Sequence, residues 1–113
     1  MSETPIPERE RSLPENPAVI SHLTGVLSED QRTVRVNVEL SNGLTQPDLE
    51  LILKSAEQLE LSRTTIIENI GPRLSFTMHI RQQQVKFPLI LACQLSYLTD
   101  KVYFEKEIAL ENK

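Results

Sequence analysis

The sequence predicts an α+β domain, with a mainly antiparallel sheet of about five to six strands and one amphipathic helix, at about residues 46–60, packed on one face. Two observations support this prediction. Apolar and polar residues alternate in several short segments, as they do in strands with one buried face. A single segment between them repeats its apolar residues at helical spacing.

Alternation is clearest in residues 33–40, 73–81 and 102–110. In the first of these segments, Val34 and Val36 share one face and Arg35 between them is polar. Such a pattern is typical of a strand that packs on a core with one side and meets water with the other. These segments are therefore expected to be three strands of the sheet.

Residues 85–98 differ, because apolar side chains occupy every odd position from 85 to 97 and several even positions as well. This pattern predicts a strand that is covered on both faces. Pro88 cannot donate to a strand ladder, which places it at an edge, at a bulge or at the start of the strand. A turn at residues 99–101 is expected to join this strand to the last one.

The predicted helix begins at Thr45 or Gln46, with Pro47 in its first turn, where proline is well tolerated. Leu51 lies off the apolar stripe of this helix and has no assigned partner. The stripe itself consists of Leu49, Ile52, Leu53, Ala56 and Leu59.

Two segments admit other interpretations. Residues 17–25 fit either a short helix or the first strand of a hairpin that continues to Leu27. Val26 and Leu27 extend the apolar pattern beyond Gly25, which favours the hairpin. Residues 64–70 are expected to form a further short strand.

Length and composition limit the remaining possibilities. The chain has 113 residues, 39% hydrophobic and 25% charged, which suits one globular domain. Residues 1–17 hold four of the seven prolines, so we expect a disordered tail followed by a single domain at residues 18–113. No apolar run approaches the roughly 20 residues of a membrane helix, and the first residues lack the features of a signal peptide. We therefore expect no membrane insertion and a cytoplasmic location.

The sequence offers little material for catalysis. It contains two histidines, His22 and His79, and one cysteine, Cys93, which lies in an apolar row and is expected to be buried and inert. No motif with the spacing of a nucleophile or of metal ligands surrounds these residues. We therefore expect no enzymatic activity, no catalytic residue, no cofactor and no metal.

Charge argues against nucleic acid as a partner, because the net charge is −4 and aromatic residues make up only 4% of the chain. The one basic strip is weak, and Phe76 faces away from it, whereas a stacking surface needs aromatic and basic side chains on one face. The strip consists of Arg73, His79, Arg81 and Lys86.

These observations favour a non-catalytic protein-interaction module, an accessory, assembly or regulatory subunit that acts through an apolar sheet surface. The alternative is a carrier or chaperone-like protein that binds a small apolar ligand or an exposed peptide segment in a pocket between helix and sheet. One helix covers only one sheet face, so we expect a homodimer, or else a different protein partner, at the hairpin of residues 85–110. The expected contact residues are Leu51, Phe87, Ile90, Leu91, Tyr97 and Tyr103.

Overall fold

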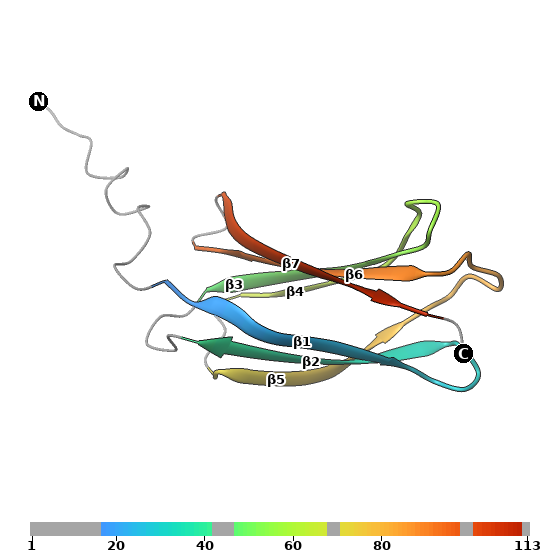
Figure 1. Cartoon of the computed structure of the whole chain (residues 1–113), viewed down its shortest axis with the longest axis horizontal. Coiled ribbons are helices and arrows are strands. Elements are labelled where there is room, and N and C mark those ends of the chain that lie inside the picture. Colours follow the sequence, from blue (N-terminus) through green and yellow to red (C-terminus); the bar gives the residue numbers. More distant parts are fainter. Residues whose placement is uncertain (1–16, 42–46, 68–70, 98–100, 112–113) are drawn as a thin grey trace, which may run out of the picture.

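The computed structural model describes residues 17–41, 47–67, 71–97 and 101–111, and these form seven antiparallel strands and no helix. The predicted α+β class is therefore wrong, and the chain is an all-β sandwich (Figure 1). The predicted tail lies outside the described residues except for Pro17. The strands are β1 (Val19–Leu27), β2 (Thr33–Ser41), β3 (Asp48–Lys54), β4 (Glu60–Ile66), β5 (Arg73–His79), β6 (Leu89–Ser96) and β7 (Val102–Leu110).

The strands form two sheets that lie face to face, one with the order β1-β2-β5 and the other with the order β4-β3-β6-β7 (Figure 1). All pairings within the sheets are antiparallel. The arrangement is close to that of an immunoglobulin constant domain, except that the fourth strand pairs with the third instead of joining the first sheet. Within the described part of the chain, no helix is long and apolar enough to cross a membrane.

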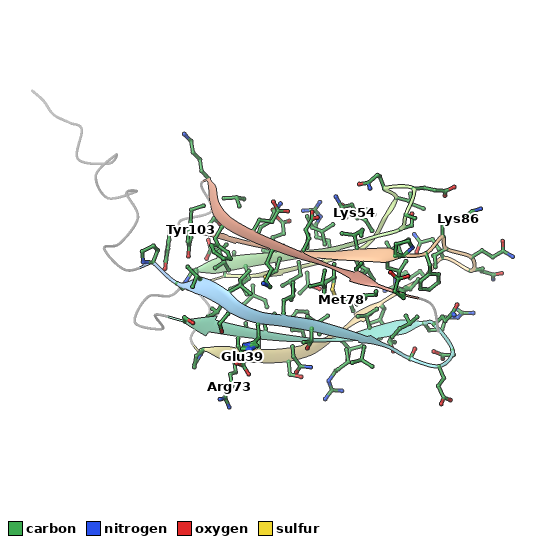
Figure 2. The ribbon with its side chains drawn as sticks, in the orientation of Figure 1. Glu39, Lys54, Arg73, Met78, Lys86 and Tyr103 are labelled. Carbon is green, nitrogen blue, oxygen red and sulfur yellow. The ribbon has the colours of Figure 1, made fainter. Side chains whose placement is uncertain are left out.

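A single apolar core fills the space between the sheets. Val34, Val36 and Val38 of β2 point into it from one side, and Leu91 and Leu95 of β6 point into it from the other. Met78 of β5 also lies between the sheets (Figure 2). The apolar row predicted to need a partner is therefore covered by the second sheet of the same chain.

The segment predicted to be a helix is instead β3, followed by a turn and the start of β4. Leu49, Leu51 and Leu53 recur at every second position and are fully buried, so they form the inner face of a strand. Ile52 produced the apparent helical stripe, but it lies on the outer face of the sheet. Ser55 then ends the strand, because its hydroxyl accepts the backbone N–H groups of residues 57 and 59 in a tight turn.

The other strand predictions fared better. The hairpin alternative for residues 17–25 is confirmed by β1, and the strands at 33–40, 73–81 and 102–110 are confirmed by β2, β5 and β7, although β5 ends at His79. The predicted strand at 85–98 is confirmed from Leu89 onward, with Pro88 just before its start. The strand expected at 64–70 lies earlier, as β4.

Two tyrosines close one end of the sandwich. The rings of Tyr97 and Tyr103 are stacked, with their centroids 5.2 Å apart and an interplanar angle of 10°. The Tyr97 hydroxyl accepts a hydrogen bond from the backbone N–H of Ala18 at 3.1 Å, and the Tyr103 hydroxyl donates to the carbonyl of Ala18 at 2.6 Å. Burial and the hydrogen bond to Tyr97 raise the pKa of Tyr103. The pair therefore fastens the start of β1, in one sheet, to the other sheet.

We expect Tyr103→Phe to lower the free energy of unfolding by about 1 kcal/mol, because it keeps the ring stack but leaves the carbonyl of Ala18 without its donor. Urea denaturation of both proteins measures the difference. An unchanged midpoint and slope would show that this hydrogen bond adds nothing to stability.

Candidate interaction surface

The residues considered for catalysis do not come together. Nδ1 of His22 lies 3.6 Å from Oε1 of Glu39 on the exposed face of the three-stranded sheet. His79 lies at the other end of the same face, where its partner on β2 is Thr33. Cys93 faces the core from the other sheet. The described residues also contain no group of three or more His, Cys, Asp or Glu side chains placed to hold a metal ion.

Cys93 is fully buried among apolar side chains, as its position in the apolar row predicts. Burial raises the pKa of its thiol to about 12, because a thiolate would lose its hydration in this core. A thiol that stays protonated at neutral pH is a poor nucleophile. In this fold, Cys93 acts as a small apolar core residue.

Ionisation of Cys93 gives a testable pH dependence. The thiol of the unfolded chain ionises above about pH 9, whereas the folded chain holds the proton until about pH 12. The unfolded state is therefore favoured as the pH rises through this interval, and the free energy of unfolding should fall by about 1.4 kcal/mol per pH unit from this group.

Cys93→Ala isolates the effect, because it removes the thiol and keeps every other group that titrates at high pH. We expect the stability difference between wild type and Cys93→Ala to shift steadily in favour of the variant between pH 9 and pH 11. Urea unfolding at several pH values measures it, and parallel stability profiles would contradict the assignment.

The predicted basic strip is spread out in the structure. Arg73 and His79 lie at opposite ends of β5, and Nε of Arg73 is 3.8 Å from the carboxylate of Glu39 (Figure 2). Arg81 and Lys86 are exposed in the connection that follows β5, and the carbonyl of Lys86 accepts a hydrogen bond at 2.9 Å from the backbone N–H of Ala56, in the turn after β3. The four side chains do not form one continuous surface on a strand.

The predicted contact residues also separate into different environments. Leu51 and Leu91 are fully buried in the core, so they present no surface in this fold. The hydroxyls of Tyr97 and Tyr103 both hydrogen-bond to the backbone of Ala18 at one end of the sandwich. Phe87 packs against the core, and Ile90 alone among the six lies half-buried on the outer face of the four-stranded sheet.

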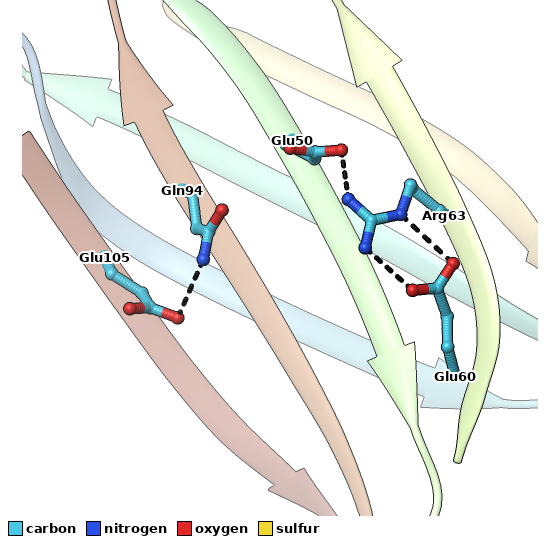
Figure 3. Close-up of polar contacts among 5 residues, drawn as sticks. All are labelled: Glu50, Glu60, Arg63, Gln94 and Glu105. Atoms are coloured by element: carbon cyan, nitrogen blue, oxygen red, sulfur yellow. Dashed lines mark hydrogen bonds and ion pairs between the residues drawn. The ribbon is translucent and has the colours of Figure 1, made fainter. Parts of the chain in front are cut away.

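That outer face is bound together by polar side chains (Figure 3). Arg63 of β4 donates to Glu60 at 2.7 and 3.0 Å and also to Glu50 of β3, which lowers the pKa of Glu60. Gln94 of β6 donates to Glu105 of β7 at 3.3 Å. These contacts span all four strands in pairs.

A shallow hollow of about 150 Å³ lies at one end of the same face. Its polar lining includes Asp48, Glu50, Gln94 and Ser96, and Ile67 and Val102 are among its apolar residues. Glu50 already binds Arg63, and Asp48 is buried with polar contacts of its own. The hollow is therefore small, and its carboxylates are partly occupied.

The larger depression is a groove of about 540 Å³ on the side of the sandwich where β1 of one sheet lies beside β7 of the other. In Figure 1, β7 ends close to the turn between β1 and β2. Val26 on this groove is 61% exposed, the highest value among the large apolar side chains that the structure describes. The groove is lined by Gly25, Val26, Leu27, Ser28, Glu29, Gln31, Ala109, Leu110 and Glu111.

Gly25 sets how closely the two strands approach. A Cβ atom at this position would lie 3.2 Å from Cδ2 of Leu110 and 3.3 Å from Cδ2 of Leu91, which is tighter than ordinary van der Waals contact. The absent side chain allows Leu110 to pack over the backbone of β1. Leu110 thereby forms the floor of the groove.

The turn at the end of the groove is held rigidly. Oγ of Ser28 donates to Asp30 at 2.6 Å and accepts the N–H groups of Arg32 and Thr33. The Ser28 hydroxyl and the N–H of Arg32 lower the pKa of Asp30, which keeps it charged. Gln31 takes a positive φ of 61° within this turn. Because the turn is already ordered, a ligand that binds beside it would cause little further loss of conformational entropy.

The sequence contains one signal for this groove. Val26 and Leu27 are consecutive apolar residues in a strand, so one of them must face away from the core. Leu27 packs against the core and Val26 faces outward. Nothing in the sequence indicated that the ends of β1 and β7 meet.

No family model matches this chain, and no curated protein matches it either. Among solved structures, it is similar to part of the β-glucuronidase of Parabacteroides merdae, whose crystal structure has glycerol in the active site. The TM-score is 0.58 and the sequence identity 14%, and the match covers 82% of this chain but 13% of that enzyme. At this identity the likeness shows the β-sandwich fold alone.

Proposed function

We propose that this chain is a non-catalytic protein-interaction module that binds another protein surface at the groove between β1 and β7. The observation that carries the proposal is the combination of a 540 Å³ groove with a large apolar side chain, Val26, exposed beside it. Exposed apolar surface that is rimmed by polar groups marks interaction sites more often than it marks ordinary surface. Glu29 and Glu111 provide such a rim.

The position of the groove also supports a protein partner. It lies along β1, which has β2 as its one paired neighbour in its sheet. An unpaired strand edge offers backbone N–H and C=O groups that an extended segment can bind, while a neighbouring groove receives its side chains.

The alternative function, a carrier of a small apolar ligand, is supported by the volume of the groove, which falls in the usual range for ligand pockets. However, pockets for small ligands enclose most of the ligand and orient it with a few precisely placed polar groups. Here the apolar lining belongs to strands at the rim of the sandwich, which favours an extended segment over an enclosed small molecule.

Site-specific photo-crosslinking tests the proposed function. A benzophenone amino acid replaces Val26 in one protein and Val102 in the matched control, since both valines are exposed strand residues but Val102 lies outside the groove. After irradiation in the native cell, we expect protein adducts from position 26 and few from position 102.

Mass spectrometry of the adducts identifies the crosslinked residue, whether it belongs to this chain or to another. Equal adduct formation at both positions would overturn the proposal. Adducts of lipid or metabolite alone at position 26 would favour the carrier function instead.

A further inference from the structure

We propose that the partner at this groove is a second copy of the chain, which adds its β1 antiparallel to β1 across a two-fold axis at Val26. The inference rests on the proposed function, because it names the occupant of the same groove. The resulting sheet would have six strands, with the order β5-β2-β1 continued by β1-β2-β5 of the partner subunit. Its support comes from backbone direction, side-chain fit and charge.

The backbone of β1 presents the required groups to its free edge. The N–H of Ser28 donates to the carbonyl of Thr33 at 2.9 Å, which makes this a hydrogen-bonded pair. Hydrogen-bonded and non-hydrogen-bonded pairs alternate along an antiparallel ladder. The backbone N–H and C=O groups of Val26 therefore bond to β2. Those of Gly25 and Leu27 point away from β2, toward the free edge.

The side chains fit when the two-fold axis passes through Val26. Gly25 then forms a hydrogen-bonded pair with Leu27 of the partner subunit, and the glycine adds no side chain to the new interface. Val26 forms a non-hydrogen-bonded pair with the partner's Val26, and such pairs bring side chains closest together. The most exposed large apolar side chain of each copy is thereby covered.

Charge permits this pairing and opposes the competing one. The segment of β1 around the axis is uncharged from Leu23 to Leu27, so no two like charges face each other. In β7, the same operation about Lys106 would oppose lysine to lysine and Glu105 to the partner's Glu107, which is destabilising. Charged residues on edge strands are a common protection against pairing.

Within their bounds, the two remaining edge strands carry no exposed large apolar side chain, although Leu59 and Ile67, directly before and after β4, are exposed. Arg63 on β4 is held in ion pairs with Glu50 and Glu60. The middle of β5 is uncharged, but its outward side chains, Ser75 and Thr77, are polar. On β7, Val102 is exposed and borders the 150 Å³ hollow, but Val26 is the more exposed of the two valines and lies at the larger groove.

Introducing a charge at Val26, on the two-fold axis, tests the proposal. Val26→Lys and Val26→Glu each place like charges opposite each other in a homodimer, and both variants should fold because the side chain is exposed. Sedimentation equilibrium of the full chain should show a monomer–dimer equilibrium for wild type and at least tenfold weaker association for each variant. An equimolar mixture of the two variants should recover dimer, because lysine then faces glutamate.

Val102→Lys and Val102→Glu are the matched controls and should dimerise as wild type does. A wild-type monomer at the highest concentration, or two variants that dimerise normally, would overturn the homodimer. Variants that weaken association but recover nothing on mixing would also overturn it, since position 26 would then lie off the axis. A monomer whose position 26 still crosslinks a different protein would leave the proposed function standing and remove only this inference.

Discussion

The structure depends on one contact, the apolar face of a three-stranded sheet against the apolar face of a four-stranded sheet. Neither sheet is stable alone, because each would expose a continuous row of valine or leucine side chains to water. Val36 on one side and Leu91 on the other are both fully buried by this contact. Every other feature, including the tyrosine closure and the groove, lies at the margin of this core.

This contact explains which parts of the fold were predictable. A strand with one buried face shows alternating apolar and polar residues in the sequence, so β2, β5 and β7 could be identified from that alternation alone. The sequence pattern of a strand does not show which element packs against its buried face. The row that includes Leu89 and Leu95 was correctly interpreted as needing a cover, but the cover expected on the second face of the strand was wrong, because that face is the outer surface of the sandwich. Sequence alone also does not say whether a cover is a helix, a sheet or another chain.

The error at residues 46–60 has a specific physical cause. Leu49, Leu51 and Leu53 form a period-two row, but Ile52 and the residues after it add apolar side chains at helical spacing. Ile52 can be apolar on the outer face because β4 and β6 flank β3, and Ile52 is only 9% exposed between them. A central strand can therefore carry apolar residues on both faces, and the resulting sequence pattern resembles the apolar stripe of a helix. Leu51, which did not fit the helix, was the evidence against it.

The interaction surface was harder to predict than the fold, because it depends on where two distant strands end. Gly25 and Leu110 are far apart in the sequence and meet only because β1 and β7 border opposite sheets on the same side of the sandwich. The two strands treat their free edges differently. β7 carries the alternating charges of Glu105, Lys106 and Glu107, whereas β1 is uncharged from Leu23 to Ser28. An edge with alternating charges resists pairing, and an uncharged edge beside an apolar groove permits it. The chain thus protects one border of its sandwich and leaves the adjoining border open to a partner.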